Sequence, residues 1–150
     1  MSSTADTKIS PITQTLAAYI AAAPRKALPK AVTEKTKHHI LDTLAAMVSG
    51  SKLPPGKAAL AYAKTLGGTK EATVVGSRMQ STAVNAALAN AMMAHADETD
   101  DSHAPSMMHP GCAIVANALA FGERCRTSGT AMLRAVALGY DVGARLNISL

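Results

Sequence analysis

Residues 95–111 gather most of the side chains in this chain that could move a proton or bind an ion. The segment reads HADETDDSHAPSMMHPG and holds four of the ten acidic residues and three of the five histidines. Carboxylates and imidazoles are common proton donors and acceptors in enzymes near neutral pH. His109 precedes Pro110, which is a start signal for a helix, and the free N–H groups of a helix N-terminus favour an anion. A substrate carboxylate bound there would meet an imidazole and backbone donors together.

Two other interpretations of this segment remain open. An acidic loop before a helix is often only a solvated connection. A divalent metal ion is the second alternative, with His95, Asp97, His103 and His109 as ligands, because imidazoles and carboxylates bind such ions. The histidines follow a His-x7-His-x5-His spacing, which matches no recognised zinc motif, and the chain has no HExxH sequence. We therefore predict no metal ligands.

The charge distribution argues against several classes of partner. The net charge of +5 would ordinarily suggest nucleic acid. However, the basic residues are spread over separate predicted helices, and no Lys or Arg lies between Arg78 and Arg124. Aromatic residues that could stack on bases or anchor an amphipathic helix in a membrane surface are few: no Trp, one Phe and three Tyr. We expect neither nucleic acid nor a membrane as a partner.

The composition and periodicity predict an all-α fold. Alanine occupies 31 of the 150 positions, which favours helices packed through small side chains. Apolar periodicity with Pro, Gly and Ser signals predicts helices over residues 11–23, 30–49, 56–66, 82–95 with Ser81 as N-cap, 111–124 and 130–146. A Pro-Pro-Gly turn is predicted at 54–56. We expect a bundle of about six helices over residues 11–150, after a flexible N-terminus at 1–10, with one very short extended segment near 72–76 that links helices.

The remaining sequence features concern the compartment and the end of the chain. The N-terminus lacks the apolar core of a signal peptide, and no apolar run approaches the length of a membrane span. Cys112 and Cys125 form no recognised metal or disulfide pattern, so we expect free thiols in a cytoplasmic protein. The sequence stops at Leu150 directly after a helical pattern, which predicts a fragment or a subunit that needs a partner.

Three segments resemble the MmgE/PrpD family, which includes 2-methylcitrate dehydratase, cis-aconitate decarboxylase and iminodisuccinate epimerase. They are HHILDTLAAMVSGS, ALANAMMAHADETDDSHAPSMMHPG and ALAFGERCRTSGTAMLRAVALGYDVGARL, so the resemblance spans roughly residues 12–148. It implies a large helical domain, of which this chain holds an incomplete N-terminal portion, joined in full-length members by a smaller α+β domain. It also implies chemistry without metal or organic cofactor on small di- and tricarboxylates, by loss of water or CO2 or by movement of a proton.

The resemblance also assigns roles to individual residues. Glu98 stands where decarboxylase-type members have an active-site Asp, Ser102 where they have Thr, and His109 matches their His before Pro. Asp100 and Asp101 match the paired Asp of the family. We therefore expect His109 and Glu98 to be catalytic, Ser102 and His103 to bind substrate, and Asp100 and Asp101 to support the loop and nearby basic groups.

The predicted function is the N-terminal part of a cofactor-independent lyase or isomerase that abstracts a proton next to a carboxylate. The resemblance places the family's catalytic lysines and a further His beyond Leu150, so we expect a homo-oligomer or a complementing chain. A non-catalytic helical subunit or fragment and a metal-binding helical protein are the alternatives.

Overall fold

The computed structural model describes residues 9–150, so most of the predicted flexible N-terminus lies outside the described residues. Within this range the chain is mainly helical, which confirms the predicted fold class. The α-helices are α1 Pro11–Ala22, α2 Lys30–Gly50, α3 Pro54–Leu66, α4 Ala83–Ala96, α5 Pro110–Cys125 and α6 Gly129–Ile148. Two 3₁₀ turns, η1 Ala23–Arg25 and η2 Ala104–Ser106, and two short strands, β1 Ala72–Thr73 and β2 Gln80–Ser81, complete the described elements.

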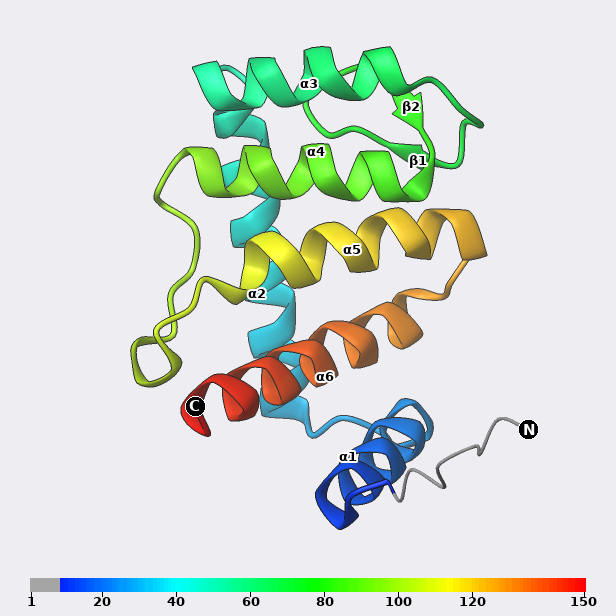
Figure 1. The fold of residues 1–150 in the computed structure, drawn as a ribbon, viewed down its shortest axis with the longest axis vertical. Helices are drawn as coiled ribbons and strands as arrows, with labels where there is room; N and C mark the ends of the chain where they lie inside the picture. Colours follow the sequence, from blue (N-terminus) through cyan, green and yellow to red (C-terminus); the bar gives the residue numbers. More distant parts are fainter. Residues whose placement is uncertain (1–8) are drawn as a thin grey trace, which may run out of the picture.

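Four of the helices form a row that the longest helix crosses. Helices α3, α4, α5 and α6 lie side by side in that order, and α2 runs across one side of the row (Figure 1). Helix α1 lies beyond α6, to which the Tyr19 hydroxyl connects it through a 2.6 Å hydrogen bond to Asp141. The connection from α4 to α5 leaves the row near the C-terminal end of α6 (Figure 1). This arrangement brings α2, α4, α5 and α6 around one loop.

The core is built from small side chains, as the composition predicts. Most of its buried apolar residues are alanines, and the largest fully buried side chains include Met47, Met93 and Val115. Small residues let helices approach closely, and Gly50 shows this directly: a Cβ there would overlap the carbonyl of Met93 on α4. Tight packing of this kind fixes the end of α4, from which the candidate site begins.

Two predicted boundaries are wrong for identifiable reasons. Helix α3 begins at Pro54, not after a Pro-Pro-Gly turn, because prolines at the first helical positions lack only N–H groups that have no partner there anyway. Ser81 is the last residue of β2, and Thr82 is the N-cap of α4 in its place, where its side chain accepts a hydrogen bond from the Asn85 amide.

The segment near residue 72 is a small hairpin and not a simple linker. Strands β1 and β2 pair antiparallel, with Ala72 opposite Ser81. The buried Asn90 side chain on α4 holds this hairpin, because its amide donates to the Thr73 carbonyl at 3.1 Å and its oxygen accepts from the Val75 amide at 2.9 Å. Among residues 9–150, no helix is both long and apolar enough to cross a membrane.

Candidate active site

The loop between α4 and α5 has a defined conformation that begins at Glu98. This residue follows the end of α4 with a left-handed backbone, φ 54°, a conformation that often terminates helices. Further along, the His103 amide donates to the Met108 carbonyl at 2.9 Å, which closes the tip of the loop. The Asn147 side chain on α6 donates to the Ser106 carbonyl at 3.0 Å and holds this tip. Two consecutive aspartates, Asp100 and Asp101, are thereby placed between the surrounding helices.

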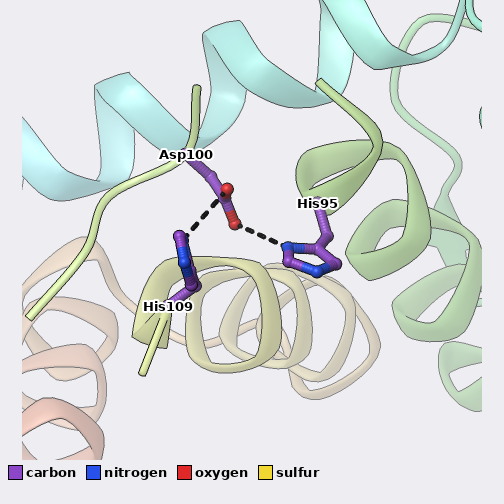
Figure 2. A group of neighbouring side chains, drawn as sticks. All are labelled: His95, Asp100 and His109. Carbon is purple, nitrogen blue, oxygen red and sulfur yellow. Dashed lines mark hydrogen bonds and ion pairs between the residues drawn. The ribbon is translucent and has the colours of Figure 1, made fainter. Parts of the chain in front are cut away.

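Asp100 is a buried carboxylate that faces two histidines. Its side chain has no exposed surface. Its Oδ2 accepts a 3.3 Å hydrogen bond from the His95 Nδ1, and its Oδ1 lies 3.3 Å from the His109 Nδ1 (Figure 2). The second contact has ion-pair distance without hydrogen-bond alignment, so Oδ1 has no hydrogen-bond partner within residues 9–150. Asp100 therefore fixes the facing edges of both rings but keeps one oxygen unsatisfied.

The two histidines come from the facing ends of neighbouring helices. His95 lies in the last turn of α4 and His109 is the N-cap of α5. Their rings meet edge to face with centroids 5.5 Å apart, and their side chains are 53% and 39% exposed. In the described part of the chain, no hydrogen bond uses either Nε2 atom, so both remain open to a ligand.

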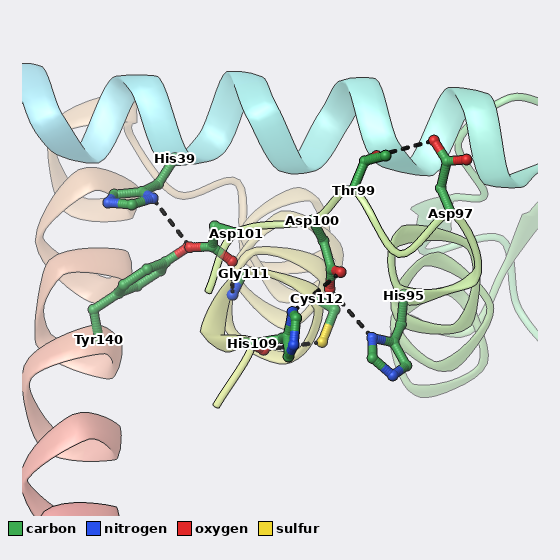
Figure 3. A network of polar contacts seen from close by, with 10 residues as sticks. All are labelled: His39, His95, Asp97, Thr99, Asp100, Asp101, His109, Gly111, Cys112 and Tyr140. Carbon is green, nitrogen blue, oxygen red and sulfur yellow. Dashed lines mark hydrogen bonds and ion pairs between the residues drawn. The ribbon is translucent and has the colours of Figure 1, made fainter. Parts of the chain in front are cut away.

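Asp101 is contacted by groups from three helices, two of which donate hydrogen bonds to it. Its Oδ1 accepts the Gly111 amide at 2.9 Å, and its Oδ2 accepts the Tyr140 hydroxyl at 2.6 Å and lies 3.0 Å from the His39 Nδ1 (Figure 3). Burial, together with the hydrogen bond to Asp101, raises the pKa of Tyr140 above its ordinary value, which keeps the hydroxyl a donor. The Gly111 amide at the start of α5 thus donates to Asp101, a carboxylate of the chain itself.

Gly111 is required by this close packing. A Cβ at this position would lie 2.6 Å from the Asp101 Oδ1 and 2.9 Å from the Tyr140 hydroxyl oxygen. Both separations are shorter than a side-chain carbon tolerates. The Pro110-Gly111 pair after His109 therefore starts the helix and leaves room for the Asp101 carboxylate.

Cys112 adds a donor beneath His109. Its Sγ lies 3.1 Å from the His109 carbonyl oxygen, to which the thiol donates. Burial raises the pKa of the Cys112 thiol, and the negative charge of Asp100 raises it further. The thiol therefore stays protonated and supports the backbone at His109. Both cysteines are free, as expected.

Comparison with known proteins gives one clear result. The model of the MmgE/PrpD N-terminal domain matches residues 14–150. The chain belongs to the MmgE/PrpD family. This confirms the resemblance that the loop and its flanking helices suggest, over nearly all of the sequence. No curated protein and no solved structure matches the chain.

Within this MmgE/PrpD domain, the predicted site residues divide into separate groups. His109, Asp100 and Asp101 lie where the helices meet. Glu98 and Ser102 are exposed, and neither side chain makes a hydrogen bond with another described residue. His103 bonds through Nδ1 to the Ser106 hydroxyl at 2.7 Å. Together with Lys35, His39 and Tyr140, it lines a pocket of about 570 Å³ between α2 and α6.

The fold also separates the four residues that the sequence offers as metal ligands, which are His95, Asp97, His103 and His109. Asp97 accepts a 3.0 Å hydrogen bond from Thr99, away from the histidines of the MmgE/PrpD loop (Figure 3). Of the residues that the structure describes, His95, Asp100 and His109 bring three ligand atoms within 4.8 Å of one another. Neither Asp97 nor His103 belongs to this group.

Sequence reasoning missed His39 and Tyr140 as partners of Asp101. Tyr140 lies 39 positions along the chain from Asp101, and His39 lies in a basic helix where packing or exposure is the simpler explanation. No local pattern marks either residue, because only the crossing of α2 over α5 and α6 brings them to the loop.

Proposed function

We propose that this domain is the N-terminal part of a cofactor-independent lyase or isomerase acting on small di- or tricarboxylates. The observation that carries the proposal is the pair of half-exposed imidazoles, His95 and His109, that face the buried carboxylate of Asp100. Such an arrangement is suited to proton abstraction next to a substrate carboxylate. Departure of a hydroxyl group as water, with a proton from the second imidazole, would complete a dehydration, and return of the proton to the other face would complete an epimerisation. In a decarboxylation the imidazole would instead donate a proton to the carbanion that is left when CO2 departs.

His109 is the proposed proton acceptor. Its Nδ1 faces Asp100 at 3.3 Å, which leaves Nε2 on the far side of the ring to receive the substrate proton. The imidazolium formed in that step gains a positive charge, and the adjacent carboxylate compensates it, as in other carboxylate–histidine pairs. His95 stands beside it and can return the proton or hold a substrate carboxylate.

Glu98 and Ser102 are the proposed orienting groups. The backbone of Glu98 is left-handed at φ 54°, a conformation that costs a residue with a Cβ about 1–2 kcal/mol and that glycine adopts freely. A glutamate at such a position supports a role for its exposed side chain. Ser102 adds an exposed hydroxyl on the same loop, and His103 remains a predicted substrate ligand at the mouth of the α2–α6 pocket.

Replacement of His109 by Ala tests this proposal. The compounds to be tested are 2-methylcitrate, cis-aconitate and iminodisuccinate. Turnover is followed by NMR in D2O, with the protein expressed from its natural gene. We expect His109→Ala to lower kcat by about 10²–10⁴-fold, the usual contribution of a general base. The matched control is His38→Ala, an exposed histidine on α2, which should leave kcat unchanged. Unaltered turnover in His109→Ala would contradict the assignment.

A second candidate is a helical subunit that needs a partner chain. The observation in its favour is an apolar groove of about 690 Å³ between α1 and α6. Around it, Ile12 is 81% exposed and Leu146 is 50% exposed. We propose that a second copy or a complementing chain covers this face. Light scattering after size exclusion should show an assembly larger than one chain, and a stable monomer would count against this candidate.

A further inference from the structure

The fold assembles a three-ligand cluster from residues that the sequence spacing does not connect. His95 closes α4, His109 opens α5, and Asp100 lies between them on the loop (Figure 2). Each histidine Nδ1 lies 3.3 Å from an Asp100 oxygen. Around Zn²⁺, bonds of about 2.0–2.1 Å in a tetrahedron separate neighbouring ligand atoms by about 3.3–3.4 Å. His95 faces Oδ2 and His109 faces Oδ1, so each oxygen of Asp100 has one ring nitrogen at this separation, and the three ligand atoms lie within 4.8 Å of one another.

The unsatisfied oxygen of Asp100 points independently to a ligand at this place. Its Oδ1 is buried and has no hydrogen-bond partner within residues 9–150, and the side chain as a whole has no exposed surface. A buried carboxylate oxygen without a partner is costly, whereas a cation placed against it removes that cost. The oxygen lies beside the His109 ring, where the three candidate ligand atoms converge.

We propose that His95, Asp100 and His109 bind a divalent transition-metal ion, Zn²⁺ in particular. Two imidazoles and one carboxylate form a ligand set typical of transition metals, whereas Mg²⁺ and Ca²⁺ prefer oxygen ligands. The two half-exposed rings leave an entry path from solvent and an open coordination position. The spacing of the histidines along the sequence cannot reveal a site made by two helix ends, and a metal ion that takes no part in turnover agrees with the metal-independent chemistry that the family resemblance implies.

Occupancy of this site has a consequence for catalysis that rests on the proposed function. A metal ion on the His109 Nδ1 moves the proton of the neutral ring to Nε2. Because Nε2 then carries this proton, it cannot accept another one from a substrate. The metal would therefore compete with proton transfer, and Zn²⁺ would inhibit turnover without taking part in it.

Metal binding is tested directly by titration calorimetry with Zn²⁺ and by visible absorption with Co²⁺. A Cys125→Ser background removes the exposed thiol as a competing ligand. We expect one ion per chain and absorption bands of four-coordinate Co²⁺. His95→Ala and His109→Ala should each weaken binding by about tenfold or more. His38→Ala, a matched exposed histidine outside the cluster, should bind as the unaltered chain does.

Several outcomes separate this inference from the proposed function. Circular dichroism checks that each variant folds, and Asp100→Asn provides a second test with little change in shape. Absence of saturable binding, or binding by His95→Ala and His109→Ala that is as tight as in the unaltered chain, would overturn the metal site whatever the turnover shows. Zn²⁺ binding in a protein without turnover would support the metal site and count against the lyase. Turnover that Zn²⁺ leaves unchanged while the site is saturated would overturn the inhibitory role.

Discussion

Asp100 and Asp101 are adjacent in sequence but have opposite surroundings. Asp101 is satisfied by the Gly111 amide, the Tyr140 hydroxyl and the His39 ring, from three different helices. Asp100 is more deeply buried, yet one of its oxygens has no hydrogen-bond partner in the described residues. Its two neighbours are rings whose outer edges reach solvent. One carboxylate therefore completes the fold, whereas the other is prepared for a ligand or a proton.

The difference between the two aspartates indicates that one short acidic segment can contribute both to stability and to function. Buried polar groups that are fully paired stabilise one arrangement of the chain. Buried polar groups that lack a hydrogen-bond partner lower the stability of the fold, and they often occur at functional sites. Under the proposed function, Asp101 stabilises the fold and Asp100 serves the chemistry, and variants of the residues around each carboxylate test this difference.

The largest effect on stability is expected at Asp101. Asp101→Ala leaves the Tyr140 hydroxyl and the Gly111 amide without their partner. We expect the free energy of unfolding to fall by about 3 kcal/mol, the typical cost of breaking a buried charged hydrogen-bond network. Urea denaturation followed by circular dichroism measures it. A loss below about 1 kcal/mol would show that Asp101 is not the structural member of the pair.

A smaller loss is expected at Gly111. Gly111→Ala places a Cβ against the Asp101 carboxylate and the Tyr140 hydroxyl. We expect a cost of about 2 kcal/mol, typical of overpacking. The control is Gly122→Ala on the same helix, where a Cβ would have nothing within 4 Å. Thermal melts of the two variants compare them directly, and equal melting temperatures would contradict the packing argument.

Tyr140 links the same network to pH. Because its pKa is raised in the folded state, its contribution to stability is complete below the ordinary tyrosine pKa of about 10 and is lost as the pH rises above that value. Tyr140→Phe should cost about 1.5 kcal/mol at neutral pH, and the difference from the unaltered chain should shrink in alkali. Denaturation at several pH values measures this, and a difference independent of pH would contradict it.

The smallest effect on stability is expected at Asp100. Asp100→Asn removes a buried charge that, among residues 9–150, is hydrogen-bonded by the His95 ring alone, so the loss of one contact is offset by the removal of an unsatisfied carboxylate. We expect the free energy of unfolding to change by less than about 1 kcal/mol. Turnover and Zn²⁺ binding should nevertheless be impaired. A large loss of stability in this variant would remove the contrast with Asp101.

The sequence predicts the helices more completely than the site. Proline, glycine and alanine signals act locally, so all six helical spans agree with the structure to within two residues at each end. A difference of two residues occurs at the start of α3, where Pro54 and Pro55 begin the helix instead of preceding it, and at the end of α6. The HPG motif likewise marks the start of α5 without any knowledge of the fold.

The remaining features of the site depend on tertiary packing. Glu98 is exposed and has a left-handed backbone, and a glutamate in the sequence does not predict that conformation. His39 and Tyr140 reach Asp101 only because α2 and α6 flank the start of α5. The pairing of His95 with His109 through Asp100 requires two helix ends to meet, which linear spacing does not encode.

The most direct test of the central claim is the response of the histidine side chains to a tricarboxylate. Once assigned, a two-dimensional ¹H–¹⁵N spectrum resolves the signals of the individual imidazoles. The rings of His95 and His109 beside Asp100 can then be compared with those of His39 and His103. Addition of 2-methylcitrate should shift the signals of His95 and His109 and leave exposed His38 unchanged. If only His39 and His103 shift, or if no imidazole responds, the Asp100 side is not the functional side of the loop.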